Sequence, residues 1–458
     1  MEGTKLYALL VVALIIGLAI GYPVGYYTAP AKEIVKEVPK EVVKEVKVHP
    51  LSGQTIYLGL IGASVAGMEW EEPVAKKAIE DVNNYIKMMG LDVKFDIYIE
   101  CAEGSAPKAL QLIQDLHARG VKFVVGLRWS SHCKSVLEYA NEHKIICVSD
   151  GSTSPLLSIP DDFLFRLPTD DRFQGRAIAK MLESYGIKYL AILQRGDTWG
   201  KGLYEALKEN FEALGGEIIF YIEYDPEKTE FSAEIEQMAA AVRDAIDKYG
   251  AEHVAVEVIG FGEIRTMVAT ASDYPELMSI MWFGNDGYVR DTILLEEQGP
   301  AALMTRHPST YVGPTESAAY NAFAEWFQRT VGYVPGAYQC YLYDSIWIIA
   351  KAILEAGTTD TEVVRKVLPK VAESYFGVSG WCRLNEAGDR AMADYNIWGI
   401  VTKQEAEQWN LKTLGEWYNA TINGQFIEFT WALVGVYRAV TDTVEWYVPI
   451  PMPKPLSS

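Results

Sequence analysis

Residues 121–157 read VKFVVGLRWSSHCKSVLEYANEHKIICVSDGSTSPLL, and this stretch decides the fold of the chain. Two short apolar runs flank a segment of helical character, and this strand–helix–strand pattern predicts neighbouring parallel strands. Small hydroxyl residues follow both runs, with Ser130 and Ser131 after the first and Thr153 after the second. Because ligands bind at the carboxyl ends of strands in open α/β sheets, these two loops predict a seat for an anion such as a carboxylate. The alternative is that the three hydroxyls only cap helices.

The composition is that of a globular protein large enough for two lobes. The chain has 458 residues, of which 49% are hydrophobic and 22% are charged. Its formal net charge of −20 argues against a nucleic-acid partner. The five cysteines form no CxxC pair, the six histidines are isolated, and no Walker A, GxSxG or HExxH motif is present. We therefore expect no metal, no cofactor and no enzymatic activity.

The N-terminal region predicts attachment to a membrane. Residues 6–27 are apolar over about the length of one membrane span. The small residues at 29–31 resemble a signal-peptide cleavage site, which is the alternative interpretation. We favour an anchor in residues 1–31, with the bulk of the chain outside the cell. The Lys-, Glu- and Val-rich residues 32–52 then form a stalk, and the proline-rich residues 449–458 form an extended tail.

From residue 55 onward, apolar strands alternate with amphipathic helices, which predicts a doubly wound α/β architecture. The expected strands span 56–61, 93–99, 121–125, 145–148, 187–193, 217–222, 253–258 and 279–283. The expected helices span 107–119, 173–185, 202–214 and 231–249, with two more near 315–330 and 338–356. Residues 402–430 are irregular and are expected to be an insertion before a last strand at 431–437. This insertion holds the glycosylation sequon at Asn419.

Several short motifs occur in a characteristic order: GLIGA at 59–63, FVVG at 123–126, GSTSPL at 151–156, DTWGKG at 197–202 and FGVSG at 376–380. Together they resemble the branched-chain amino-acid (leucine/isoleucine/valine) binding proteins, the type I periplasmic solute-binding proteins of ABC importers. The resemblance covers roughly residues 55–400. It implies two Rossmann-like lobes with parallel sheets, joined by three crossings that fall near Pro168, near 306–310 and near 377–381. It assigns 53–168 and 311–378 to the first lobe, and 169–310 and 379–448 to the second.

The resemblance also implies a ligand site. Ser130 and Thr153, with the backbone around Gly151, match positions that hold an amino acid's carboxylate and share its ammonium group. From the second lobe, Trp199 and Phe261 match aromatic positions, and Asp286 matches the acidic residue that pairs with the α-ammonium, where a glutamate is usual.

Each second-lobe residue has a plainer alternative. Asp286 lies in an Asn-Asp-Gly sequence that is an ordinary turn, and the two aromatic side chains would also serve as packing on the lobe surface. The ligand's own side chain would meet the loop at 64–70. There Met68 and Trp70 would line an apolar pocket, or Glu69 would select a basic or hydroxylated side chain.

The cysteines bear on the chain's location. Cys101 matches a family cysteine that forms a disulfide, and Cys133 is its nearest partner candidate. Cys340 and Cys382 are a second possible pair, and Cys147 is expected to be a core residue.

The resulting hypothesis is an extracellular, membrane-anchored receptor that closes on an amino acid or small carboxylate and delivers it to ABC permease subunits. The alternatives are a sensory ectodomain or a structural surface protein with the same fold.

Overall fold

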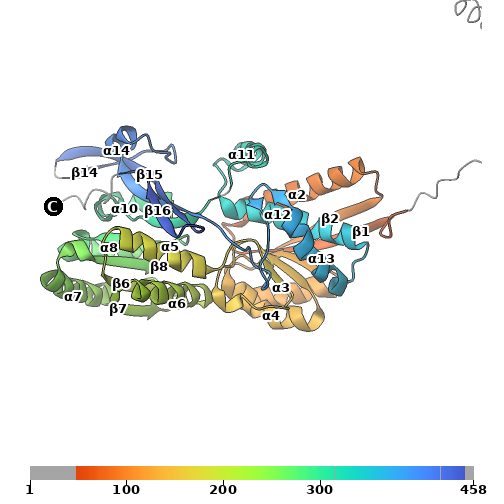
Figure 1. Cartoon of the computed structure of the whole chain (residues 1–458), viewed down its shortest axis with the longest axis horizontal. Coiled ribbons are helices and arrows are strands. Elements are labelled where there is room, and N and C mark those ends of the chain that lie inside the picture. The colour runs from red at the N-terminus through yellow and green to blue at the C-terminus, as the bar shows by residue number, and fades with distance from the viewer. Residues whose placement is uncertain (1–47, 314, 423, 449–458) are drawn as a thin grey trace, which may run out of the picture. The chain divides into compact units, whose positions relative to one another are not determined.

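A computed structural model describes residues 48–448, apart from positions 314 and 423 (Figure 1). Within these residues, no helix is long and apolar enough to cross a membrane. The expected anchor at 6–27, the stalk up to residue 47 and the tail at 449–458 lie outside the described residues.

The first lobe is built on a parallel sheet of five strands in the order β2-β1-β3-β4-β5. The strands are β1 (Gln54–Gly62), β2 (Val93–Cys101), β3 (Phe123–Gly126), β4 (Ile146–Ser149) and β5 (Leu164–Arg166). Side chains alternate between the two faces of a strand, so Leu60 and Ile61 of β1 pack into two different hydrophobic clusters, one on each face of the sheet. Both faces of this sheet are therefore buried, which explains why its strands are continuous apolar runs.

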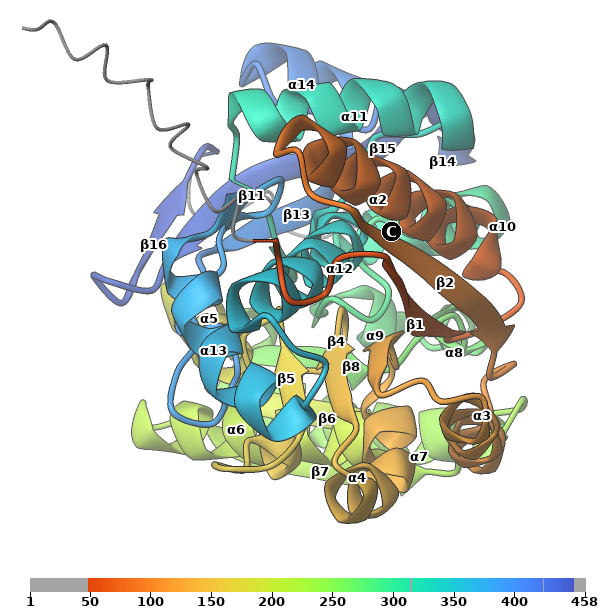
Figure 2. The ribbon, with the colours of Figure 1, turned by 90° about the vertical axis from the view of Figure 1, so that its right-hand side faces the viewer.

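Helices cover both faces of this sheet. On one face α2 (Met68–Met88) packs on α12 (Ala337–Ala356), which also contacts β3 and β4, while α13 (Thr361–Ser374) packs on α12. On the other face, α3 (Ala106–Ala118) packs on α4 (Ser130–His143) (Figure 2).

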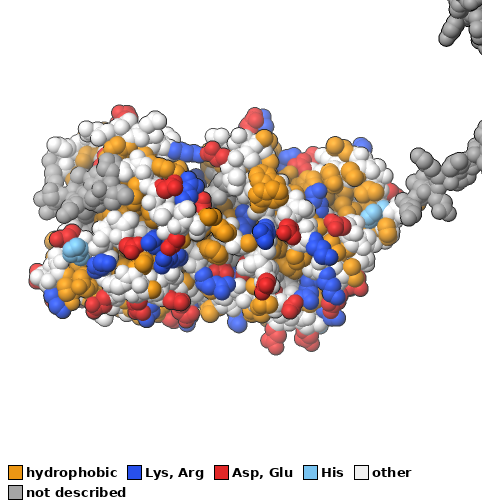
Figure 3. Space-filling view, in the orientation of Figure 1, with side chains coloured by type: hydrophobic (Ala, Val, Ile, Leu, Met, Phe, Trp, Pro, Cys, Tyr) orange, Lys and Arg blue, Asp and Glu red, His pale blue; other side chains and the backbone are white. Residues whose placement is uncertain are grey.

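The second lobe has a parallel sheet in the order β7-β6-β8-β9. Its strands are β6 (Tyr189–Arg195), β7 (Glu217–Tyr224), β8 (Val254–Ile259) and β9 (Met281–Phe283). Its helices are α5 (Asp171–Ser184), α6 (Thr198–Ala213), α7 (Ser232–Tyr249), α8 (Ile264–Ala271), α9 (Pro275–Met278) and α10 (Thr292–Thr305). The predicted doubly wound α/β class is confirmed in both lobes. Acidic and basic side chains are interspersed over the face shown in Figure 3.

The C-terminal part is an antiparallel sheet that extends the second lobe. Its strands are β10 (Ser309–Val312), β13 (Tyr395–Thr402), β14 (Tyr418–Ile422), β15 (Gln425–Arg438) and β16 (Thr443–Trp446). An isolated parallel bridge between Gly284 and Ser309 connects it to β9. The expected insertion at 402–430 holds α14 (Lys403–Gln408) and β14, and β15 begins well before the predicted residue 431. The prediction was wrong there because β15 is defined by pairing with the distant β13. Asn419 is exposed on β14, and its glycosylation stays a prediction.

Three segments connect the lobes. The chain leaves the first sheet after β5 and enters α5. It returns from β10 to α11 (Ala318–Val331) and α12. It crosses again after the hairpin of β11 (Phe376–Gly377) and β12 (Gly380–Trp381) to reach β13. The lobe boundaries given above stay a prediction.

A buried ion pair joins the first crossing to the third. The Arg166 guanidinium donates to both carboxylate oxygens of Asp389, at 2.5 and 2.7 Å, and both side chains are at most 1% exposed. Arg166 also donates to the carbonyl of Ser154 at 2.7 Å.

The cysteine pairs expected from the sequence are not formed. All five cysteines are free, and the expected Cys101–Cys133 disulfide is absent. Cys133 is buried and its thiol donates to the Leu127 carbonyl at 3.0 Å. Cys101 accepts instead from the Glu103 N–H in the turn after β2. Cys382 likewise contacts Asp344 and Arg390 rather than forming a bond to Cys340.

Candidate ligand-binding site

The loops after β3 and β4 lie against each other, as the strand–helix–strand pattern predicts. A Cβ on Gly151 would lie 2.3 Å from the Arg128 Cγ and 2.9 Å from the Arg128 carbonyl oxygen, so only glycine allows this approach. The Ser130 hydroxyl lies 3.0 Å from that of Ser152 and accepts from the Ser154 N–H at 3.3 Å. Two of the predicted positions, Ser130 and Gly151, therefore hold one loop against the other.

Ser130 is not a helix cap. It is the first residue of α4, and the preceding N-cap residue, Trp129, makes no side-chain hydrogen bond to the helix. The helix therefore begins without a side-chain cap. The His132 and Cys133 N–H groups donate to the Trp129 carbonyl, which leaves those of Ser130 and Ser131 at the helix N-terminus, where an anion is favoured. The Ser130 hydroxyl is used by the neighbouring loop instead, so the capping alternative is wrong for this residue.

Sequence reasoning missed Asp171, which lies beside Thr153. Asp171 is the fully buried first residue of α5, and its Oδ2 accepts from the Thr153 hydroxyl at 2.9 Å. Its Oδ1 has no hydrogen-bond partner among the described residues. Burial and the nearby Asp286 carboxyl raise the pKa of Asp171 well above its usual range. The sequence did hold a signal for Asp171, because two consecutive aspartates stand at the first crossing. Asp170 caps α5, so the cap does not require Asp171.

Asp286 lies directly after β9 and contacts the first lobe. Its Oδ2 accepts from the hydroxyl of Tyr338 at the start of α12, while its Oδ1 is buried without a hydrogen-bond partner among the described residues. Burial raises the pKa of Asp286, against the hydrogen bond from Tyr338. The turn role belongs to Asn285, whose side chain accepts from the Gly287 N–H. Asp171 and Asp286 thus form a buried acidic pair with two unpartnered oxygens, which suits an ammonium group.

The predicted aromatic residues form a stack that reaches the other lobe. Trp199 and Phe261 are parallel, with ring centroids 4.6 Å apart, and Phe261 stacks on Trp129 of the first lobe at 5.6 Å. Trp199 is only 5% exposed. The aromatic stack therefore makes a contact between the two lobes as well as within the second lobe. A direct contact with a ligand stays a prediction for both.

The lobes also touch between the loop after β4 and α6. The Ser154 hydroxyl donates to the Thr198 carbonyl at 2.7 Å. A Cβ on Gly202 would lie 2.4 Å from that hydroxyl oxygen and 2.7 Å from the Pro155 Cδ, and the proline ring cannot rotate away. Gly202 is therefore required for this close approach of the lobes.

We expect Gly202→Ala to weaken ligand binding without destabilising either lobe, because alanine favours the helical backbone of α6. Overpacking at such a contact costs about 1–3 kcal/mol, which is roughly 5- to 160-fold in Kd. Titration calorimetry measures this change, and Glu209→Ala on the exposed face of the same helix is the matched control. Unchanged affinity in Gly202→Ala would show that the lobes close without this contact.

Two buried glutamates predict how stability depends on pH. Burial and the Asp150 carboxyl raise the pKa of Glu71 to about 8, and burial raises the pKa of Glu257 to about 8. At pH 7 the folded state therefore keeps most of a proton on each of these glutamates, and the unfolded state releases both, so the free energy of unfolding falls as the pH rises toward 8. The lowered pKa values of His132 and His307 act in the opposite direction, but mostly below pH 7, so they offset only a small part of this change.

We expect these two glutamates together to lower the free energy of unfolding by about 2 kcal/mol between pH 7 and pH 8, with about 1 kcal/mol from each. Urea unfolding of the ligand-free protein at the two pH values measures this change. Glu71→Gln should reduce the measured change by about 1 kcal/mol. An identical pH dependence in this variant would contradict the assignment.

Comparisons with known proteins agree with this architecture. The family described as "Receptor family ligand binding region" matches residues 71–403. An uncharacterized protein of Methanocaldococcus jannaschii is 28% identical over 394 residues, which cover 82% of this chain and 87% of the relative. The leucine-, isoleucine-, valine-, threonine- and alanine-binding protein of Pseudomonas aeruginosa is 22% identical over 361 residues, covering 76% of this chain and 91% of the relative.

Among solved structures, the leucine binding protein of Thermotoga maritima has a TM-score of 0.63 at 19% identity, and the match covers 82% of this chain and 98% of that one. This likeness confirms the type I periplasmic binding fold. The resemblance to the branched-chain amino-acid binding proteins is also confirmed. Because the family match spans more than half of the length of this chain, the chain belongs to the family of receptor ligand-binding regions.

Proposed function

We propose that the chain is the solute-binding protein of an ABC importer and that it binds an α-amino acid between its two lobes. The observation that carries this proposal is the buried pair of Asp171 and Asp286, each with one carboxyl oxygen lacking a hydrogen-bond partner among the described residues. This pair would hold the ammonium group. The N-terminus of α4 and the loop around Gly151 would hold the carboxylate.

Closure of the lobes depends on groups from both of them. Ser130, Gly151 and Thr153 belong to the loops of the first sheet, whereas Asp286 follows a strand of the second. A ligand that contacts both sides stabilises the closed form more than the open form, and only such a difference shifts the equilibrium between the two.

In this proposal the chain works outside the cell, held by residues 6–27 as an anchor, and it delivers its ligand to ABC permease subunits. Cells that lack the protein should lose uptake of the bound amino acid. Under the sensory alternative, uptake would stay at the wild-type level.

A thermal-shift screen of the full chain, with mild detergent present, tests ligand binding. The panel holds the common α-amino acids and the matching 2-oxo acids, which keep the carboxylate and lack the amine. A ligand at a hundred times its Kd adds about 2.7 kcal/mol of stability. A shift with an amino acid but not with its 2-oxo acid supports the ammonium site. Equal shifts with both compounds would contradict the role of Asp171 and Asp286 in binding the ammonium group. If no compound in the panel shifts the melting temperature, the proposed function is wrong.

A further inference from the structure

Beside the acidic pair lies a second charged group that the proposed function does not use. It consists of Glu71 in the first turn of α2, Arg128 after β3 and Asp150 after β4. These side chains meet at the carboxyl ends of three neighbouring strands of the first sheet, β1, β3 and β4. We refer to them as the charged triplet.

The two carboxyl groups of the triplet are buried and incompletely paired, while the Arg128 side chain is 22% exposed. The Asp150 side chain is fully buried, and neither of its carboxyl oxygens has a hydrogen-bond partner among the described residues. Its nearest cation is the Arg128 Nη1, at 3.7 Å, which is too long for a hydrogen bond. That Nη1 is itself buried without a hydrogen-bond partner among the described residues. Glu71 is 1% exposed and, among the described residues, accepts only from the Ala63 N–H, at 3.1 and 3.4 Å.

Such groups are rare in folded proteins, because leaving a buried charge without hydrogen bonds is costly. A purely structural role for the triplet would be served by close, bidentate arginine–carboxylate pairing, as seen between Arg166 and Asp389. The missing partners of Asp150 and Arg128 therefore point to groups that a ligand supplies.

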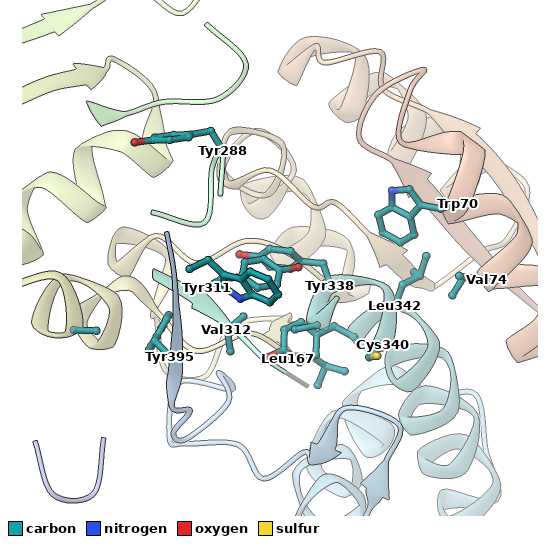
Figure 4. Packing of buried hydrophobic residues seen from close by; sticks show 14 of the residues in the cluster. Trp70, Val74, Leu167, Tyr288, Tyr311, Val312, Tyr338, Cys340, Leu342 and Tyr395 are labelled. Atoms are coloured by element: carbon teal, nitrogen blue, oxygen red, sulfur yellow. The ribbon is translucent and has the colours of Figure 1, made fainter. Parts of the chain in front are cut away.

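The side chain of Tyr338 contacts both the charged triplet and the acidic pair. The Arg128 guanidinium lies over the ring of Tyr338 at 4.5 Å and over that of Trp70 at 4.8 Å. The hydroxyl of the same Tyr338 donates to Asp286. Figure 4 shows Trp70 and Tyr338 coming from two different helices of the first lobe, α2 and α12. An amino acid with its ammonium group at Asp171 and Asp286 would thus have the triplet within reach of its side chain.

The balance of charge decides which side chain fits. Glu71, Asp150, Asp171 and Asp286 contribute four carboxyl groups. Arg128 and, on the second-lobe side, Arg290 contribute two guanidiniums. Arg290 packs over Tyr311 and Trp398, away from the triplet. Burial raises the pKa of each of these four carboxyls, so they ionise readily only beside a cation. A zwitterionic backbone adds no net charge, so a positive side chain of the ligand is what supplies that cation.

Resting on the proposed function, we infer that the chain selects an α-amino acid with a cationic side chain, of the lysine, ornithine or arginine type. The side-chain cation lies against Asp150 and Glu71 and displaces Arg128 from Asp150. A leucine or isoleucine side chain would instead leave the carboxyls buried and unpaired, which disfavours the branched-chain ligands. Glu69, the residue that the sequence suggested for this selection, is exposed and takes no part.

Titration calorimetry of the full chain in mild detergent with L-lysine, L-arginine, L-ornithine, L-leucine and L-glutamate tests this inference. At least one basic amino acid should bind at least about 100-fold more tightly than leucine. The isosteric variants Asp150→Asn and Glu71→Gln should each weaken that binding by about tenfold or more. The neighbouring Glu69→Gln is the matched control and should leave the affinity unchanged.

Three results would overturn the inference. If leucine binds as tightly as the basic amino acids, the triplet does not select the ligand, although the proposed amino-acid receptor stands. If L-glutamate binds most tightly and loses affinity in Arg128→Ala, the pocket recognises an anion and again only the inference fails. If no amino acid binds while the protein melts cooperatively, the proposed function fails and the inference with it.

Discussion

Replacing Asp286 by asparagine is expected to weaken binding of the preferred amino acid by about 2–5 kcal/mol, which corresponds to roughly 30- to 5,000-fold in Kd. The variant keeps the size of the side chain but removes the charge that pairs with the ammonium group. The amide still accepts from the Tyr338 hydroxyl, so the contact between the lobes survives. The loss therefore reports on the charge rather than on the shape of the site.

The same variant is expected to leave the ligand-free protein as stable as the wild type, or to stabilise it. Burial opposes ionisation of Asp286, and its charge also raises the pKa of Asp171, so removing it relieves an unfavourable pair. Calorimetry for binding and thermal melting for stability separate the two effects.

Asp273→Asn serves as the control, because Asp273 is an exposed aspartate of the same lobe and should change neither quantity. Wild-type affinity in Asp286→Asn would show that the charge of Asp286 does not contribute to ligand binding. A large loss of stability would instead assign it a structural role.

The second large effect is expected at the buried pair between the first and third crossings. Asp389→Ala leaves the Arg166 guanidinium buried without its counter-ion, which should lower the free energy of unfolding by about 3–5 kcal/mol. Urea unfolding of the ligand-free protein measures the loss. Because Arg166 also donates to the Ser154 carbonyl, the loop that holds Gly151 and Thr153 should become less ordered in this variant.

A matched surface pair provides the control for this measurement. Arg329 and Glu325 are about 70% exposed, and Glu325→Ala should cost less than about 1 kcal/mol. Replacing both Arg166 and Asp389 by leucine should restore part of the stability, because apolar side chains leave no uncompensated charge. A loss in Asp389→Ala no larger than that in Glu325→Ala would contradict the structural role of the pair.

Much of the fold could be predicted because its signals are local. Strands that are buried on both faces read as apolar runs, and the helices between them read as amphipathic segments. The chirality of strand–helix–strand units then places the loops after β3 and β4 side by side without further information. For the same reason, the proximity of Ser130 to the loop that holds Gly151 and Thr153 was predictable from residues 121–157, while their role as a carboxylate seat stays a prediction.

Other features depend on partners far along the chain. The antiparallel sheet was missed because the pairing of β15 with β13 spans the irregular residues 402–430 and has no local pattern. The expected disulfide failed because spacing does not report where a side chain points, and Cys133 faces the Leu127 carbonyl.

The sequence by itself determined the α/β class, the crossing at the end of β5 and the approach of the two first-lobe loops that hold Ser130, Gly151 and Thr153. Only the tertiary structure decided which acidic residues lie next to those loops. Asp171 is an ordinary residue of a helix start until Thr153 and Asp286 lie beside it, and Asp150 is an ordinary loop residue until Glu71 and Arg128 do. The physical reason is that a carboxyl group acquires its role from burial and neighbouring charges, and both are set by packing between segments distant in sequence.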